Sequence, residues 1–232
     1  MLFWYDYTMI ALIPALIFSL YASIRVQSTY SKYARVKNCR GMTGAQAAEA
    51  ILQANGVYDV RIERVPGNLS DHFDPRSKVL RLSNGVHDAD SVSAIGIAAH
   101  EAGHAVQHAQ GYGPLKVRSA LVPIVNIATN VAWILFILGL FFTTQSGQTL
   151  MTIGIVMFSS CVVFQLVTLP VEINASRRAV TEIAALNLGD EQDVQGVRKV
   201  WNKAALTYVA GLITAIAQVL RLLLIRNRRS NN

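Results

Sequence analysis

Four apolar segments constrain this chain more than any other feature of its sequence. They cover approximately residues 2–24, 121–142, 150–169 and 204–225, and each is close to the roughly 20 residues that a helix needs to cross a bilayer core. Hydrophobic residues make up 52% of the chain and charged residues only 15%, whereas about a quarter of a soluble domain is charged. We therefore expect a mainly α-helical integral membrane protein with three or four membrane helices.

The first three segments predict an anchor and a hairpin. The first has no basic residue before its apolar run and contains Asp6, which favours a retained N-terminal membrane anchor over residues 1–24 and not a cleaved signal peptide. The second and third are joined by the short uncharged stretch 143–149. This arrangement predicts a transmembrane helical hairpin over residues 121–170.

The distribution of basic residues predicts how the chain is oriented. Residues 25–120 carry 12 of the 21 Lys and Arg residues and residues 171–203 carry five, while 1–24 and 143–149 carry none. The positive-inside rule places the first two regions in the cytoplasm. The net charge of +7 is therefore attributed to orientation in the membrane, and we expect no nucleic-acid partner.

The last segment allows two placements. Residues 204–232 contain an alanine-rich apolar run with Thr207, Thr214, Gln218 and Arg221, so they form either a spanning helix or an interfacial helix with a basic tail. A spanning helix would put the arginines after residue 225 outside the cell, against the positive-inside rule.

Between the anchor and the hairpin, residues 25–120 predict a small α+β domain. The expected elements are a helix after the capping-box pair Thr43 and Gln46, two pairing strands at 57–65 and 78–82, a turn at 83–85 and a helix from Ser91 to about Gln110. After the hairpin, residues 171–203 are expected to include a further soluble helix.

The last predicted helix of this domain carries a His-Glu-x-x-His run. Because residues four apart lie on one helical face, the imidazoles of His100 and His104 can bind one metal ion. Glu101 lies beside them, where its carboxylate can take a proton from a water that the metal activates. The run predicts one catalytic Zn²⁺; the alternative is an ordinary helix with two hydrogen-bonded histidines and a surface glutamate.

A catalytic zinc ion needs a third protein ligand. His108 continues the series, but on a straight helix it is roughly 9 Å along the axis from a metal midway between the first two histidines. His72 and His87 lie in predicted loops, where either could bind the ion. Glu172 is the preferred candidate, because a carboxylate next to a membrane segment is costly without a partner.

The predicted hairpin supports this choice, because it returns the chain to the side on which the two histidines lie. The alternative for Glu172 is an ion pair with Arg177 or Arg178.

Further runs accompany the metal motif in a definite order, at 71–76 (Asp-His-Phe-Asp-Pro-Arg), 80–83, 98–108, 168–172, 175–179 and 205–210. Together they resemble the membrane-bound neutral zinc metallopeptidase family (the YugP-like proteins). The layout is also distantly similar to the gluzincin membrane proteases of the prenyl-protein (CAAX) and heat-shock types.

The resemblance implies a zincin-like domain in which a glutamate on a later helix completes the zinc site, a role that falls on Glu172. In the gluzincin membrane proteases, an aspartate four residues after that glutamate supports a zinc-bound histidine. Ser176 stands at this position and cannot supply the negative charge. Asn174 or a backbone carbonyl is the alternative.

These patterns favour a metalloendopeptidase of the cell membrane that cleaves peptides or proteins, including membrane proteins. The strand at 78–82 could bind an extended peptide at the sheet edge. A donor for the developing oxyanion is sought among His72, Tyr208, Arg177 and Arg178. The alternatives are a non-catalytic scaffold or chaperone subunit that retains a structural zinc, and a metal transporter.

Overall fold

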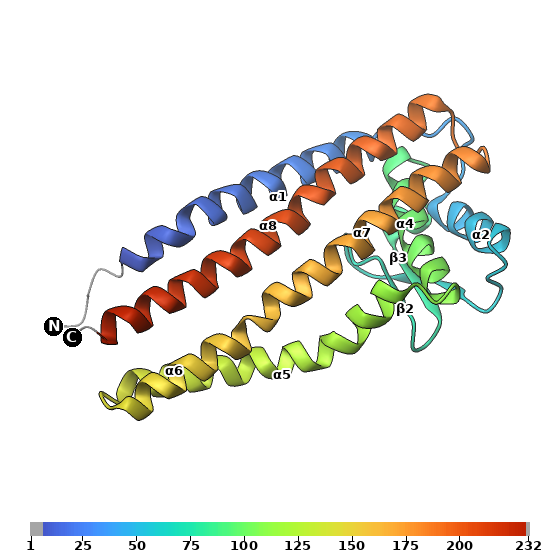
Figure 1. Cartoon of the computed structure of the whole chain (residues 1–232). Helices are drawn as coiled ribbons and strands as arrows, with labels where there is room; N and C mark the ends of the chain where they lie inside the picture. Colours follow the sequence, from blue (N-terminus) through green and yellow to red (C-terminus); the bar gives the residue numbers. More distant parts are fainter. Residues whose placement is uncertain (1–6, 231–232) are drawn as a thin grey trace. The chain divides into compact units, whose positions relative to one another are not determined.

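The computed structural model describes residues 7–230 of the chain. Most of this part is helical, with one small sheet, and Figure 1 shows the course of the chain through its elements. In chain order these are the 3-10 helix η1 (Tyr7–Leu12), α1 (Ile13–Tyr33), α2 (Gly44–Ala54), β1 (Arg61–Val65), β2 (His72–Asp74), β3 (Val79–Ser83), α3 (Asn84–His87), α4 (Val92–Ala109), α5 (Gly113–Phe141), α6 (Gln145–Phe158), α7 (Ser160–Ala185) and α8 (Glu191–Ser230).

The chain forms two compact units. One, here called the bundle unit, contains the described residues up to Ser23, the range Val117–Leu169 and the described residues from Thr207 onward. The other, here called the α+β unit, contains Ile24–Lys116 and Pro170–Leu206. The helices α1, α5, α7 and α8 contribute residues to both units.

Within residues 7–230, four helical stretches are long and apolar enough to cross a membrane: Thr8–Tyr33, Gly113–Phe141, Gln145–Ala185 and Glu191–Arg229. Large apolar side chains on these helices are exposed, Ile127 to 66% and Phe141 to 78%, as expected for surfaces that face lipid. The predicted fold class, a mainly α membrane protein with a small α+β part, is confirmed. Asp6 and the start of the predicted anchor lie outside the described residues.

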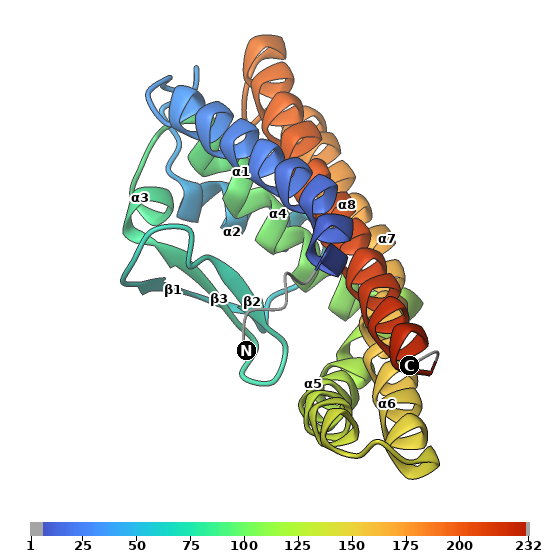
Figure 2. The ribbon, with the colours of Figure 1, turned by 90° about the vertical axis from the view of Figure 1, so that its left-hand side faces the viewer.

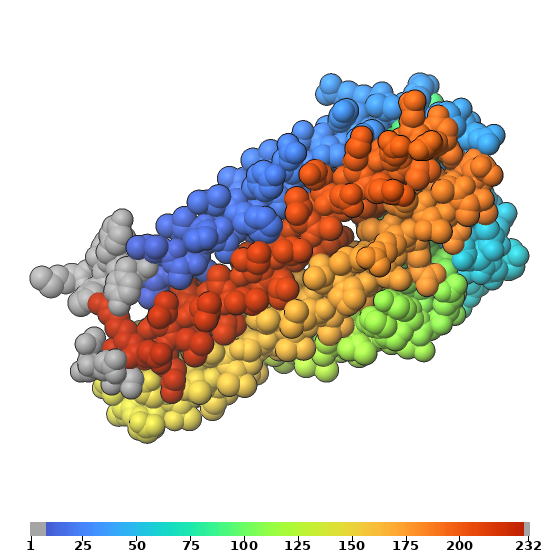
Figure 3. Space-filling model, turned by 45° about the horizontal axis from the view of Figure 1, so that its top comes forward, coloured from blue at the N-terminus to red at the C-terminus, as the bar shows by residue number. Residues whose placement is uncertain are grey.

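Glycines allow the helices of the bundle unit to pack closely. A Cβ atom on Gly154 of α6 would lie 2.8 Å from the Ala132 carbonyl oxygen of α5, which is typical of helix contacts in membranes. Met151 of α6 and Phe136 of α5 form a buried cluster with Leu222 of α8, and the red end of α8 lies against the yellow α6 in Figure 3.

The hairpin differs from its prediction in two details. Its connection is shorter than 143–149, because α6 already begins at Gln145, after the N-cap residue Thr144; the polar residues of this stretch form the first helical turn. The predicted single segment 150–169 is also interrupted at Ser159. The hydroxyl of Ser159 donates to the Ile155 carbonyl at 2.9 Å, a bond that bends helices.

The α+β unit is built on a sheet with the strand order β1-β3-β2 (Figure 2). The two predicted strands do pair, in parallel, although β1 begins only at Arg61. The strand β2 was not predicted. It is three residues long, too short to show an alternating pattern, and it pairs antiparallel with β3, so that Phe73 faces Leu80. The predicted turn at 83–85 is the start of the short helix α3.

The two predicted helices of this unit are confirmed. At the start of α2, the hydroxyl of Thr43 accepts from the Gln46 amide and the side chain of Gln46 accepts from the Thr43 amide. Both α2 and α4 contact the sheet. The core between them contains Ile51, Leu80 and Ile95, each fully buried.

The first residue of α2 is a glycine in a confined position. A Cβ atom on Gly44 would lie 2.2 Å from the carbonyl oxygen of Val86, a backbone atom that cannot move alone. We therefore expect Gly44→Ala to lower the free energy of unfolding by about 1–3 kcal/mol, measured as thermal unfolding in mild detergent. Gly85→Ala is the matched control, because its nearest neighbour is 4.0 Å away. Equal stability of the two variants would contradict the prediction.

Candidate metal centre

The helix α4 is the central element of the site. Its N-cap residue Ser91 accepts a hydrogen bond from the Ala94 amide at 3.1 Å, which fixes where the helix begins. Every residue from Val92 to Gln107 is buried except Glu101. The helix is therefore enclosed on nearly all sides, and Glu101, which is only partly buried, marks the one place in this range where the enclosure is incomplete.

Small residues bring α4 and α7 into contact at the level of the histidines. A Cβ atom on Gly103 would lie only 3.1 Å from the carbonyl oxygen of Ala175, and Ala175 itself is fully buried. This close approach carries the neighbouring Glu172 of α7 to the face of α4 that bears the two histidines.

Three side chains converge at this contact. The Oε2 atom of Glu172 lies 3.2 Å from Nε2 of His100 and 3.5 Å from Nε2 of His104. All three residues are buried, and their potential ligand atoms lie within 4.8 Å of one another. The structure thus brings together the three predicted metal ligands.

The spacing and chemistry of these donors fit a zinc ion. Nitrogen and oxygen ligands lie at about 2.0–2.2 Å from a tetrahedral zinc, so two such ligands are about 3.4 Å apart, which matches both separations between Glu172 and the histidines. Imidazole and carboxylate are also ligand types that zinc prefers. His100, His104 and Glu172 can therefore hold the metal.

Each histidine is oriented by a partner on its other ring nitrogen, as metal-binding histidines generally are. His100 Nδ1 lies 3.3 Å from the hydroxyl of Ser176, and the ring of His100 stacks on Trp201 of α8 at a centroid distance of 4.0 Å. His104 Nδ1 lies 3.0 Å from Oε1 of Gln107. Both Nε2 atoms thus point to the same place.

The orientation of the Gln107 amide follows from its other contacts. Its Nε2 group donates to the carbonyl of Val171 at 3.0 Å and to Oδ1 of Asn174 at 2.9 Å. Its Oε1 atom must therefore accept a hydrogen bond from the Nδ1–H group of His104. This assigns the tautomer of neutral His104 in which Nε2 carries the lone pair that binds a metal.

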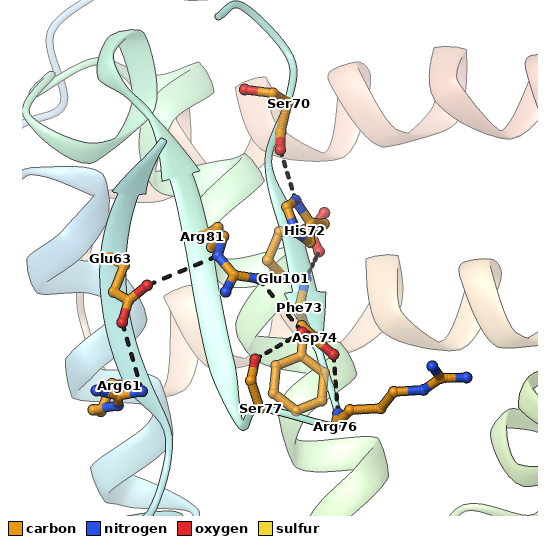
Figure 4. Close-up of polar contacts among 10 residues, drawn as sticks. All are labelled: Arg61, Glu63, Ser70, His72, Phe73, Asp74, Arg76, Ser77, Arg81 and Glu101. Atoms are coloured by element: carbon orange, nitrogen blue, oxygen red, sulfur yellow. Dashed lines mark hydrogen bonds and ion pairs between the residues drawn. The ribbon is translucent and has the colours of Figure 1, made fainter. Parts of the chain in front are cut away.

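Glu101 lies beside the three ligands and has a separate partner. Its Oε2 atom accepts a hydrogen bond from the backbone amide of Phe73 in β2 at 3.1 Å, which is drawn in Figure 4. Burial raises the pKa of the Glu101 carboxyl to about 7; the charge of His104 lowers it in part, and the charges of Glu172 and Asp71 raise it further. A carboxyl group with a pKa near neutrality can both accept and donate a proton.

The pKa of the neighbouring His104 is also raised, but by hydrogen bonding and charge and not by burial. Burial alone lowers the pKa of His104, but its hydrogen bond with Glu172 and the negative charges of Glu101 and Glu172 outweigh this effect, so that the pKa is raised. The centre therefore favours a positive charge, and a divalent cation satisfies the same preference.

Polar contacts hold β2 in position beside Glu101 (Figure 4). Asp74 accepts hydrogen bonds from the Ser77 hydroxyl at 2.7 Å and the Arg76 amide at 2.9 Å, and it pairs with Arg81. Mainly because of the Ser77 and Arg76 bonds, the pKa of Asp74 is lowered to about 2. The Asp74 carboxylate therefore stays charged over the physiological pH range and keeps its bonds to the turn after β2.

The other histidines do not join the three ligands. His72 is exposed, and its Nδ1 atom lies 2.8 Å from the Ser70 carbonyl. His87 contacts Asp88. The exposed His108 lies near the ring of Phe73, with centroids 5.8 Å apart. His72 is nevertheless adjacent to Phe73, the residue that contacts Glu101.

The remaining candidates have different surroundings. Arg178 donates from Nε to Asn174 Oδ1 at 2.9 Å, so it is linked through Asn174 and Gln107 to His104. Arg177 is exposed. Tyr208 belongs to the bundle unit. The roles suggested for these residues and for His72 in stabilising the oxyanion stay predictions.

Sequence reasoning missed three contributors to the site. The contribution of Gln107 could have been found from the sequence, since this residue lies three residues after His104 on the same helical face. The contribution of Trp201 could not, because this residue is remote in sequence from His100 and its stacking on that ring is a tertiary contact. Phe73 acts through its backbone amide, which no side-chain pattern reveals.

Comparison with known proteins agrees with this geometry. Residues 8–227 match the family described as "putative neutral zinc metallopeptidase". The chain is 44% identical over 221 residues to the "putative membrane protease YugP" of Bacillus subtilis (strain 168), covering 95% of this chain and 97% of the relative. No solved structure matches. Because the family match covers nearly the whole described chain, this protein belongs to the putative neutral zinc metallopeptidase family.

Proposed function

We propose that this protein is a membrane-embedded zinc metalloendopeptidase that hydrolyses peptide bonds, with Glu101 as its general base. The observation that carries the proposal is the position of Glu101. Its carboxylate lies close enough to His104 and Glu172 to interact with their charges, and it is not one of the three ligands. Glu101 is also the one residue of α4 between Val92 and Gln107 that is only partly buried. A purely structural metal site has no use for such a group.

The zinc ion and three side chains have separate roles in the proposed reaction. The bound zinc supplies a Lewis acid that polarises the scissile carbonyl and makes a water molecule more acidic. Glu101 takes the proton from the attacking water and delivers it to the leaving amine. Gln107 and Ser176 keep the two histidines in the orientation that presents their Nε2 atoms.

An extended substrate is expected to bind along β2. The sequence had suggested the strand at 78–82, but this was wrong, because β3 lies between β1 and β2 and both of its edges are paired. The amide of Phe73 donates to Glu101, so it points away from β3, toward the free edge of β2. A peptide added there would pass close to Glu101.

The membrane helices and the basic residues support a proposal about the substrates and the orientation. Since Glu172 lies three residues after Leu169, the last residue of its stretch in the bundle unit, we expect substrates at or near the membrane surface, including membrane proteins. The basic residues of 25–120 and 171–203 favour the cytoplasm as the side of the zinc site in the cell membrane.

Two other functions remain for comparison. A non-catalytic scaffold or chaperone subunit would retain the metal as a structural element. Such a role does not explain the position of Glu101. A metal transporter would carry its ligands inside the apolar spans. Here two of the three ligands lie on α4, which is not among the candidate spans of the described residues.

The central test compares bound zinc with proteolysis. The full chain is purified in mild detergent, its zinc content is measured, and it is incubated with casein and with a mixture of membrane proteins. We expect about one zinc per chain and cleavage. Glu101→Gln should retain the zinc and lose activity by about 10²- to 10⁴-fold, the usual contribution of a general base. Glu172→Ala should lose most of the zinc, because it removes a ligand.

The control for this test is His87→Gln, which changes a histidine outside the metal centre and should leave zinc and activity unchanged. Zinc binding without cleavage of any substrate would favour the scaffold. If the wild-type chain binds no zinc, the proposal fails.

A second test concerns Gln107. Replacing it with leucine removes the acceptor for His104 Nδ1 and removes the amide group that donates to the Val171 carbonyl and to Asn174 Oδ1. We expect Gln107→Leu to weaken zinc binding by about 10- to 100-fold, measured by competition with a chromogenic chelator. Gln110→Leu is the control, because it makes the same chemical change at an exposed position at the end of α4. Unchanged affinity in Gln107→Leu would remove Gln107 from the metal centre.

A further inference from the structure

The helix α7 presents two rows of residues to the metal centre. One row contains Glu172 and Ser176, which lie four residues apart and both contact His100. The other row occupies positions i, i+3 and i+7 of the same helix and consists of Val171, Asn174 and Arg178. The first row provides a metal ligand, whereas the second reaches the centre through Gln107.

The bond between Arg178 and Asn174 fixes the orientation of the Asn174 amide. The Nε group of Arg178 donates to this amide at 2.9 Å, and a guanidinium group has no acceptor. The Asn174 atom in the bond must therefore be the carbonyl oxygen Oδ1. The same oxygen accepts a hydrogen bond from Gln107 Nε2 at 2.9 Å. Arg178 thus determines which end of the Asn174 amide faces Gln107.

The same chain of hydrogen bonds continues to a metal ligand. Because Oδ1 of Asn174 is an acceptor, Gln107 turns its NH2 group toward it, and its Oε1 atom accepts from the Nδ1–H group of His104, 3.0 Å away. This contact is at the ring nitrogen that does not face Glu172, since Glu172 Oε2 lies 3.5 Å from Nε2 of His104. A proton on Nδ1 leaves the Nε2 lone pair available to a metal. Arg178 is therefore connected to the tautomer of His104.

The contacts of Arg178 point to orientation and not to charge pairing. None of the ion pairs formed within residues 7–230 includes Arg178, so the ion pair with Glu172 that the sequence allowed is not formed. The side chain is only partly exposed, and its Nε group donates to an uncharged amide. What this bond supplies is a donor at one defined atom of Asn174.

We propose that Arg178 is a positioning residue that acts through Asn174 and Gln107 to hold His104 in its metal-binding tautomer. Without the bond from Arg178, the Asn174 amide is free to turn its NH2 group toward Gln107, and two donors then face each other. The carbonyl of Val171, 3.0 Å from Gln107 Nε2, still favours the native orientation, so the loss is partial. This role differs from contact with an oxyanion, and it rests on the metal centre of the proposed function.

The proposal is tested by the zinc affinity of the full chain in mild detergent, measured by competition with a chromogenic chelator. Arg178→Leu should weaken zinc binding by about 2- to 10-fold, the effect of one hydrogen bond. Arg178→Gln should bind zinc like the wild type, because glutamine also carries an N–H group on Cδ, at the place of the arginine Nε, although it has no charge. Arg198→Leu is the control, since it removes an arginine from an exposed position of the same unit.

A double variant decides whether Arg178 acts through Gln107. Gln107→Leu already breaks the chain of hydrogen bonds, so adding Arg178→Leu should cause no further loss of zinc affinity. Unchanged affinity in Arg178→Leu, equal losses in Arg178→Leu and Arg178→Gln, or losses that multiply in the double variant would each overturn the proposal and leave the peptidase function standing. Zinc binding without proteolysis contradicts the peptidase alone, whereas a wild-type chain that binds no zinc contradicts both.

Discussion

The close contact between α4 and α7 is the constraint on which the metal centre depends. At Gly103, the backbone of α7 comes so near that even a methyl group would be crowded by the Ala175 carbonyl. The same contact places Glu172 within 3.5 Å of both histidines and lets Gln107 reach Val171 and Asn174. A helix separation wider by one side chain would remove all of these interactions together.

The histidines are supported by neutral groups. Ser176 and Gln107 occupy the positions where carboxylates often hold metal-bound imidazoles. The hydroxyl and the amide fix the ring orientations, and the amide also fixes the tautomer of His104, but neither group adds negative charge. The negative charge of the centre therefore comes from Glu172 and from Glu101, whose carboxylate interacts electrostatically with His104 and Glu172.

Much of this arrangement could be predicted from the sequence, because its signals are local. The metal histidines and Glu101 share one short helical motif, the capping pair Thr43 and Gln46 defines the start of α2, and the apolar segments define the membrane helices. The strand β2 could not be predicted, since three residues show no periodicity. Because β2 and not β3 is an edge strand of the sheet, the strand expected to bind an extended substrate is β2. The contacts of Trp201 depend on packing between segments distant in sequence.

The order of the ligands along the chain has a consequence for biosynthesis. His100 and His104 emerge from the ribosome well before Glu172, and the apolar residues of α5 and α6 lie between them. A nascent chain that ends before α7 holds the two histidines and Glu101 but lacks Glu172, the third member of the candidate donor set. The three candidate ligands are therefore present together only after both arms of the hairpin have been synthesised, so a shorter growing chain cannot hold the complete candidate centre.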